Sequence, residues 1–241
     1  MLTDKISLLQ EMIDKSERIV FFGGAGVSTE SGIPDFRSQD GLYNQKYPYP
    51  PETILSHTFY EKNPYWFFKF YRDKMICLNA KPNAAHKKLA ELEECGKLLA
   101  VVTQNIDGLH TAVGSKCVLE LHGSVHRNYC QKCGALYDAE FMLNTSDIPV
   151  CSCGGCIKPD VVLYEESLDG RTIERAVNAI SMADMLIIGG TSLAVYPAAS
   201  FVKYFHGDRL VILNRDATSM DESANLCIRE PIGQVLSQIK L

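Results

Sequence analysis

Short apolar runs that alternate with segments of helical periodicity are the feature that most restricts the fold of this chain. The apolar runs are RIVFF, LLAVVTQN, MLII and LVIL, at residues 18–22, 98–105, 185–188 and 210–213. Continuous runs of this length are typical of strands that are buried on both faces, as in a parallel sheet. Helices are expected at 4–16, 83–94, 172–183, 197–205 and 233–240. The alternation therefore predicts an α/β fold, with a parallel sheet and helices on both of its faces.

Glycine or polar residues end each of the four predicted strands. They are Gly23-Gly24, Gln104-Asn105, Gly190-Thr191 and Asn214-Arg215. Parallel sheets of this type bind ligands at the carboxyl ends of their strands. We therefore expect these four strand ends to meet in one crevice that holds a ligand.

The segment GGAGVSTESGIPDFRS, residues 23–38, begins where the first predicted strand ends. A glycine loop in this place usually contacts a phosphate. The segment lacks the third glycine of the dinucleotide fingerprint, since Thr29 stands there, and it lacks the lysine of a P-loop. The sequence thus predicts a phosphate-contacting loop of a different type.

Composition and charge exclude several classes of partner. The net charge is −5 and no basic run is present, so no direct contact with nucleic acid is expected. No apolar run reaches the ~18 residues of a membrane span, and acidic residues interrupt the apolar N-terminal segment, so we expect neither a membrane span nor a signal peptide. A cytoplasmic protein is expected. The length of 241 residues fits one large domain or two small ones.

Five of the nine cysteines lie between residues 130 and 156. Cys130 and Cys133 form one C-x-x-C knuckle, and Cys151, Cys153 and Cys156 follow it. Four thiolates from two knuckles form the closed tetrahedral site of a structural zinc. Clustered cysteines in a chain without a secretion signal more often bind metal than form disulfides. Generic spacing slightly favours Cys153 and Cys156 as the second pair, with Cys151 as the alternative.

Six motifs in a fixed order give a specific resemblance to a known family. They are GAGVSTESGIPDFRS, TQNIDGLH, LHGS, the double cysteine knuckle, KPDVVLYEE and GGTSL. In this order the chain resembles the sirtuins from Arg18 to its final helix. The resemblance implies an NAD-dependent protein-lysine deacetylase that consumes NAD and releases nicotinamide and 2′-O-acetyl-ADP-ribose. Its partners would be acetylated-lysine proteins or peptides; the oligomeric state is left open, with a monomer expected.

The resemblance also implies a domain organisation and a metal site. Residues 1–241 would form a single catalytic domain. Its Rossmann-like core would comprise residues 1–38, 79–125 and 157–241. A smaller lobe would combine a helical insertion at 39–78 with a zinc ribbon at 126–156. The family alignment implies the zinc ligands Cys130, Cys133, Cys151 and Cys153.

The resemblance assigns the NAD contacts to the glycine loop and to the strand ends. Around the pyrophosphate would lie Gly24, Ala25, Gly26, Thr29 and Arg37. The loop over the nicotinamide ribose would contain Asp35, Phe36 and Arg37. The ribose would face Gln104 and Asn105, and the carboxamide would bind Ile106 and Asp107. The adenosine half would contact Gly190, Thr191, Ser192, Asn214 and Ile228.

His122, in the motif LHGS, is the predicted general base, and Asn105 is the second predicted catalytic residue. A lone histidine is more often structural than catalytic. His122, however, follows an apolar strand and faces the predicted crevice, and an imidazole with a pKa near neutrality suits proton abstraction from a ribose hydroxyl. His110 and His126 match no catalytic position and are expected to be structural.

The substrate peptide would lie between the segment KPDVVLYEE and the loop after GGTSL, in contact with Val161, Val162 and Val195. In the family this segment more commonly ends in Phe-Gly-Glu, so Glu165 replaces a glycine here. Desuccinylating sirtuins carry a Tyr-x-x-Arg pair where this chain has Tyr71 and Lys74. We therefore expect an uncharged acyl group, most simply acetyl.

Two other functions stay open at this level. One is mono-ADP-ribosyl transfer on the same scaffold. The other is a zinc-stabilised module that senses NAD without turnover. His122 and Asn105 argue against the sensor, because binding alone needs no base.

Overall fold

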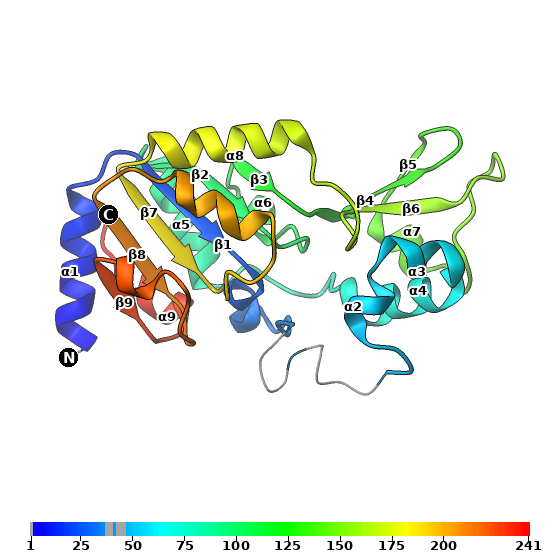
Figure 1. Ribbon diagram of the computed structural model, residues 1–241, viewed down its shortest axis with the longest axis horizontal. Helices are drawn as coiled ribbons and strands as arrows, with labels where there is room; N and C mark the ends of the chain where they lie inside the picture. The colour runs from blue at the N-terminus through cyan, green and yellow to red at the C-terminus, as the bar shows by residue number, and fades with distance from the viewer. Residues whose placement is uncertain (1, 37–40, 42–46) are drawn as a thin grey trace.

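Six parallel strands form the main sheet of the computed structural model, which describes residues 2–36, 41 and 47–241. In spatial order the strands are β3 (Val118–Glu120), β2 (Leu98–Thr103), β1 (Ile19–Gly23), β7 (Met185–Gly189), β8 (Arg209–Leu213) and β9 (Leu226–Ile228) (Figure 1). The predicted parallel sheet is therefore confirmed. The sequence identified β1, β2, β7 and β8 as apolar runs and implied a strand before His122, which is β3; it missed the edge strand β9.

The chain reverses its direction of travel across the sheet next to β1. From β1 it proceeds to β2 and β3 on one side, and later to β7, β8 and β9 on the other. The pairing of β1 with β7 runs from Ile19 opposite Met185 to Gly23 opposite Gly189. Both strands thus end in glycine at the point where the strand order reverses, which is where open α/β sheets hold their ligands.

Helices cover both faces of this sheet, as predicted (Figure 1). One face is covered by α1 (Leu2–Asp14), α5 (Ala84–Glu94) and α9 (Ile232–Leu236), whose apolar side chains share a buried cluster with Phe21 of β1. The other face is covered by α8 (Gly170–Met182) and by η5 (Ala198–Tyr204). The segment η5 is a 3-10 helix, and α9 ends at Leu236, before the predicted end at residue 240.

The helical insertion, here called the aromatic-rich segment (described over residues 47–78), and the cysteine-rich segment (residues 123–161) lie together at one end of the molecule, outside the main sheet (Figure 1). The first contributes α2 (Pro51–Ile54), α3 (His57–Lys62), α4 (Pro64–Phe70) and a π-helical turn at Tyr71–Met75. The second contributes α7 (Ala139–Leu143) and an antiparallel sheet of order β5-β4-β6, with bounds Leu136–Tyr137, Gly123–Cys130 and Ile157–Val161. One buried cluster joins them, with Phe67 and Ile54 packed among Met142 and Ile157.

Further short elements lie in the connections, among them the 3-10 turn η6 (Asp221–Ser223) between β8 and β9. The others are the 3-10 turns η1 (Ala25–Val27) and η2 (Thr29–Ser31) after β1, and α6 (Leu109–Ala112) after β2. The predicted start of α5 is confirmed, because the Asn83 side chain accepts a hydrogen bond from the Ala85 backbone while His86 Nδ1 accepts one from the Asn83 backbone. This reciprocal cap fixes where the helix begins.

The caps bring His86 into contact with a second buried histidine, His110, at a ring-centroid distance of 4.6 Å. Within the described residues, His86 Nε2 and both ring nitrogens of His110 have no hydrogen-bond partner. Burial lowers the pKa of His86 to about 4, and burial together with the neighbouring His86 lowers the pKa of His110 to about 3. Both rings are therefore neutral in the folded protein.

We expect this pair to make the fold sensitive to acid. An unfolded histidine titrates near pH 6.5, so the unfolded chain binds more protons below that pH, and stability decreases as pH falls toward the folded pKa values. Between pH 6.5 and the folded pKa, the free energy of unfolding is expected to fall by about 1.4 kcal/mol per pH unit for each ring. Urea unfolding measures the free energy of unfolding at pH 7 and pH 5. The decrease between these two pH values should be smaller for His110→Leu than for the unaltered protein. His206→Gln, at an exposed position, serves as the control; equal losses in all three proteins would contradict the prediction.

Candidate active site

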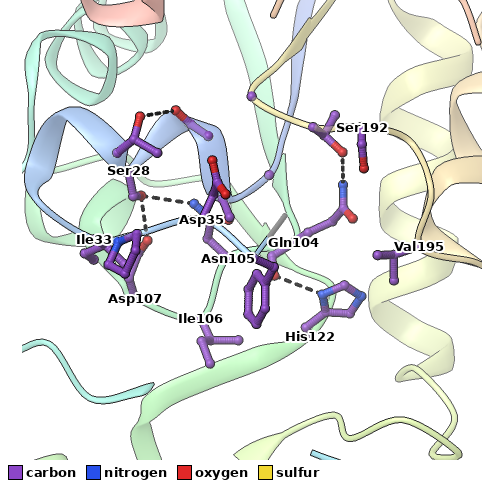
Figure 2. A pocket seen from close by; sticks show the side chains of 18 of the residues that line it. Ser28, Ile33, Asp35, Gln104, Asn105, Ile106, Asp107, His122, Ser192 and Val195 are labelled. Atoms are coloured by element: carbon purple, nitrogen blue, oxygen red, sulfur yellow. Dashed lines mark hydrogen bonds between the residues drawn. The ribbon is translucent and has the colours of Figure 1, made fainter. Parts of the chain in front are cut away.

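The predicted meeting of the four strand ends is confirmed by a cavity of about 590 Å³. Its lining includes Gly24, Gln104-Asn105, Gly190-Thr191 and Asn214-Arg215. Figure 2 shows Gln104 and Asn105 on the cavity wall. The opposite wall comes from the small antiparallel sheet and the segments beside it, including Val161 and Met75. The cavity thus lies between the carboxyl edge of the main sheet and the end of the molecule that carries the cysteines.

The glycine loop passes very close to the end of β7. The Gly26 N–H donates to the Gly190 carbonyl at 2.8 Å, and a Cβ on Gly26 would lie only 2.7 Å from the Gly190 Cα atom. A larger residue at Gly26 would therefore push the two strand ends apart. Next in the chain, Thr29 Oγ1 accepts a hydrogen bond from Arg215 at 3.1 Å, which links the loop to the end of β8.

A chain of hydrogen bonds joins this loop to the end of β2 (Figure 2). Asn105 Nδ2 donates to Ser28 Oγ at 3.1 Å, and Ser28 Oγ donates to Asp107 Oδ2 at 2.6 Å. The other carboxylate oxygen of Asp107 accepts from the Leu109 backbone at 2.9 Å. The side chains of Asn105 and Asp107 are thereby held in fixed orientations on the cavity wall.

Ser28 is a lining residue that the sequence did not single out. Its only signal was its place in GAGVS, two residues after Gly26, the glycine that approaches β7. Its contacts with Asn105 and Asp107 join residues 77 and 79 positions apart, and such pairing is not encoded in local spacing.

His122 lies two residues beyond the end of β3 and lines the cavity. Its Nδ1 atom is 2.9 Å from the Gln104 carbonyl (Figure 2). A carbonyl can only accept, so Nδ1 carries the proton and Nε2 keeps its lone pair. Burial lowers the pKa of His122 below its ordinary value, an effect opposed by the Gln104 hydrogen bond. The ring is therefore neutral near pH 7 and has an unprotonated nitrogen.

Two more side-chain contacts arrange the far end of the cavity. Gln104 Nε2 donates to Thr191 Oγ1 at 3.1 Å, and Asn214 Nδ2 donates to the Asp216 carbonyl at 2.9 Å. Ile228 does not reach the cavity: it is fully buried in β9, within the core cluster beneath the sheet. The residues that line the cavity just beyond β9 are Glu230, Pro231 and Ile232.

Most of the residues predicted from the sequence line this one cavity. They are Gly24, Ala25, Gly26, Thr29, Asp35, Phe36, Gln104, Asn105, Ile106, Asp107, His122, Val161, Val162, Gly190, Thr191, Ser192, Val195 and Asn214. Arg37 lies outside the described residues. His110 is buried away from the cavity wall, and His126 Nε2 lies 3.0 Å from the Asp107 carbonyl, which fits the structural role expected of both.

Four cysteines form a separate cluster, which tests the metal prediction. The sulfur atoms of Cys130, Cys133, Cys151 and Cys153 all lie within 4.8 Å of one another. The Sγ separations are 3.4 Å for Cys130 and Cys153 and 3.6 Å for Cys133 and Cys151, close to the ~3.8 Å edge of a tetrahedron with Zn–S bonds of ~2.3 Å. The four thiols therefore fit one structural zinc ion.

The fifth cysteine stands apart from this cluster. Cys156 Sγ is 3.5 Å from the Tyr60 hydroxyl instead. The cluster thus agrees with the ligand set implied by the family alignment, and the preference of generic spacing for Cys156 is wrong. Hydrogen bonds from the Cys153 backbone and from the Tyr137 hydroxyl lower the pKa of Cys151 to about 6, which favours the thiolate that zinc requires.

The fold and the site together define an α/β nucleotide-binding protein with a half-buried neutral histidine in its cavity and a four-cysteine metal site. A family model described as "Sir2 family" matches residues 24–197. The chain belongs to this family. Among the described residues, no helix is both long and apolar enough to cross a membrane.

Curated relatives match the chain over nearly its full length. One from Clostridium acetobutylicum is 57% identical over 99% of both chains, and one from Clostridium perfringens is 58% identical over 98% of both. Both are named NAD-dependent protein deacetylase.

Solved structures agree with this assignment. A Sir2 variant in complex with a deacetylated p53 peptide and 3′-O-acetyl ADP ribose has a TM-score of 0.90 at 36% identity, with 96% of each chain covered. A Sir2 homologue in complex with NAD has a TM-score of 0.87 at 37% identity, with 96% of this chain and 91% of that chain covered.

Proposed function

We propose that this protein is an NAD-dependent protein-lysine deacetylase, which releases nicotinamide and 2′-O-acetyl-ADP-ribose. The observation that carries the proposal is a neutral His122, held by the Gln104 carbonyl, in the same cavity as the fixed Asn105 and Asp107 side chains. The full-length relatives named as such enzymes support it. A binding module would not need an unprotonated imidazole in this place.

The cavity residues fall into groups that suit the parts of NAD. The glycine loop, Gly24 to Gly26 with Thr29, would hold the pyrophosphate, because only glycine permits this approach of backbone to backbone. Asp107 and the Ile106 backbone would bind the carboxamide, whose NH₂ group needs an acceptor. Thr191, Ser192 and Asn214 would contact the adenosine half. NAD itself supplies the leaving group, nicotinamide, and the ribose that takes the acetyl group.

The proposed role of His122 follows from its protonation state, in which Nδ1 carries the proton and Nε2 is free. Its Nε2 lone pair would accept a proton from a ribose hydroxyl, which then becomes the nucleophile toward the acyl carbon. The Gln104 carbonyl keeps Nδ1 protonated and so keeps Nε2 available. Asn105 would orient the ribose or the water beside it.

The acetyl-lysine peptide would enter between Val161-Val162 and Val195, which line the cavity from opposite walls. We propose one catalytic domain. Its core would comprise residues 1–38, 79–122 and 164–241, and its small lobe 39–78 and 123–163, because β4 begins at Gly123 and pairs with β6 (Ile157–Val161) in the small sheet, beyond the boundaries expected at 125 and 157. A cytoplasmic location belongs to the same proposal, because clustered free thiols are typical of a reducing compartment. A monomer stays the expectation for the oligomeric state.

One experiment separates the proposal from its rivals. The protein is mixed with NAD and an acetyl-lysine peptide, and the products are identified by mass spectrometry. Formation of 2′-O-acetyl-ADP-ribose and free lysine supports deacetylation. ADP-ribose attached to a protein would indicate the transferase, and binding of NAD without any product would indicate the sensor.

The pKa of His122 gives the direction of the pH dependence. The base must be neutral, so the rate falls as the ring gains a proton, and burial moves that protonation below the ordinary value near 6.5. We expect the acidic limb of kcat/KM for NAD to lie below pH ~6.5. A limb above that pH would contradict the assignment of the base.

We expect acetyl-lysine peptide to be processed at least about tenfold faster than succinyl-lysine peptide of the same sequence, measured as kcat/KM, because a carboxylate desolvated without a partner is costly. Tyr71 cannot help, since it is fully buried against Phe67. Lys74 lines the cavity, but its ammonium is 3.2 Å from the Asp73 carboxylate, which already neutralises it. Equal or faster turnover of the succinyl peptide would refute this expectation, and Lys74→Ala would then locate the cause.

A further inference from the structure

The segment from Val161 to Glu166 continues β6 into the cavity wall. β6 is an edge strand of the small sheet. Beyond it, the Tyr164 N–H donates to the Leu55 carbonyl at 2.9 Å, and the His57 N–H donates to the Tyr164 carbonyl at 2.9 Å. These two bonds attach one side of the segment to the start of α3.

Within this segment, Glu165 differs from its neighbours in backbone conformation and in backbone hydrogen bonding. It has φ of 75°, in the left-handed region that favours glycine. Throughout the described residues, neither its N–H nor its carbonyl makes a backbone hydrogen bond. The residue is exposed and lines the cavity. The backbone N–H and carbonyl of Glu165 are therefore available to hydrogen-bond the backbone of a peptide that lies in the cavity.

Glu166 holds the turn that exposes this backbone. Its Oε2 atom accepts from the Leu163 N–H at 2.9 Å, and its own N–H donates to the Leu163 carbonyl at 3.0 Å. The two residues thus close a small ring around Tyr164 and Glu165. The other carboxylate oxygen, Oε1, lies 2.9 Å from His57 Nδ1, so the turn is also tied to α3.

Lys158 of β6 forms an ion pair with Glu166 and also contacts the backbone of the segment. Its ammonium is 3.1 Å from Glu166 Oε2 and donates to the Val161 carbonyl at 3.1 Å. The side chains of Lys158 and Glu166 are only 19% and 20% exposed, so the pair is less screened than one on the open surface. Charge-assisted hydrogen bonds of this kind are roughly twice as strong as neutral ones.

We infer that the Lys158–Glu166 ion pair is a positioning pair for the peptide substrate: it holds the backbone of Val161 to Glu166 in the shape with which an acetyl-lysine peptide pairs. This inference rests on the proposed function. The two side chains touch the segment, and the described contacts join them to none of the residues proposed to bind NAD. The pair therefore acts on the affinity for peptide, through Leu163 and Val161, while the affinity for NAD is independent of it.

The test measures peptide and NAD separately in Glu166→Gln. An amide oxygen can still accept from Leu163, but the charge that holds Lys158 is gone. The Kd for a fluorescent acetyl-lysine peptide, from anisotropy, should rise about tenfold, together with the peptide KM. The KM for NAD and kcat at saturating peptide should stay within about twofold. Glu61→Gln is the matched control, since Glu61 also contacts His57, at 3.3 Å, without lining the cavity.

A second pair of variants guards against misfolding of Glu166→Gln, which its zinc content and thermal transition would reveal. Lys158→Met should weaken peptide binding, and Lys158→Arg should restore most of the loss, because a guanidinium keeps the charge. An unchanged peptide Kd in Glu166→Gln and Lys158→Met, or parallel losses for peptide and NAD, would overturn the inference. A protein that binds the peptide but never forms acetyl-ADP-ribose would instead contradict the proposed function.

Discussion

His122→Ala is expected to lower kcat/KM for deacetylation by about 10³-fold, within the range that positioned general bases supply. The imidazole is the neutral group whose free nitrogen faces the cavity, and its Nδ1 is already committed to the Gln104 carbonyl. Alanine removes the proton acceptor but leaves the strand ends that would hold NAD. Turnover of an acetyl-lysine peptide, followed as formation of 2′-O-acetyl-ADP-ribose, measures the loss.

The controls separate a catalytic loss from a structural one. His206→Ala changes an exposed histidine and should leave turnover unchanged. His122→Ala itself should keep the zinc content and the thermal transition of the unaltered protein. If the variant loses zinc or unfolds at a much lower temperature, His122 is a structural residue and the assignment of the base fails.

The strands of the main sheet were predictable where their sequences form continuous apolar runs. β1, β2, β7 and β8 are continuous apolar runs that are buried almost completely, so their composition reveals them. β3 and β9 have three residues each and pair on one side only. A three-residue run has too few positions to establish a period. The sequence therefore implied β3 only through the motif that contains His122, and it did not reveal β9.

The site was predictable through its motifs and less so through its contacts. Glycine and polar residues at strand ends indicated the crevice because parallel strands end at one edge. Ser28 was missed because its importance lies in bonds to Asn105 and Asp107 on a different strand end. Ile228 ends β9 and is not among the lining residues, which begin again at Glu230. The loose C-terminal motif does not reveal where β9 ends.

Sequence spacing was also a poor guide to the residues that bear on acyl preference, Tyr71 and Lys74. Tyr71 and Lys74 are three residues apart, a spacing that puts both on one face of a regular helix. The structure has a π-helical turn there, from Tyr71 to Met75, so the two side chains diverge. Tyr71 enters the aromatic core and Lys74 the cavity wall. Helical spacing in a sequence presumes a regular helix, and only packing decides whether it is one.

Loss of one zinc ligand is expected to have the largest effect on stability. We predict that Cys151→Ser abolishes stoichiometric zinc binding and lowers the temperature at which the small lobe unfolds. Structural zinc contributes on the order of 10 kcal/mol to the folding of small metal domains. Cys130 and Cys151 are themselves buried in the cluster that joins the cysteine-rich and aromatic-rich segments, so the loss should spread from the metal to this core. Metal analysis and thermal unfolding measure the two effects.

Cys156→Ser is the matched control, because Cys156 lies three residues from a ligand but contacts the Tyr60 hydroxyl instead of the cluster. It should keep one zinc per chain and nearly the original thermal transition. Since Val161 and Leu163 belong both to the small lobe's core and to the cavity wall, Cys151→Ser should also lose deacetylation, whereas Cys156→Ser should retain it. The opposite result, with zinc lost from Cys156→Ser and kept by Cys151→Ser, would mean that the ligand set is Cys130, Cys133, Cys153 and Cys156, and that the tetrahedral arrangement of the four sulfur atoms does not hold the metal.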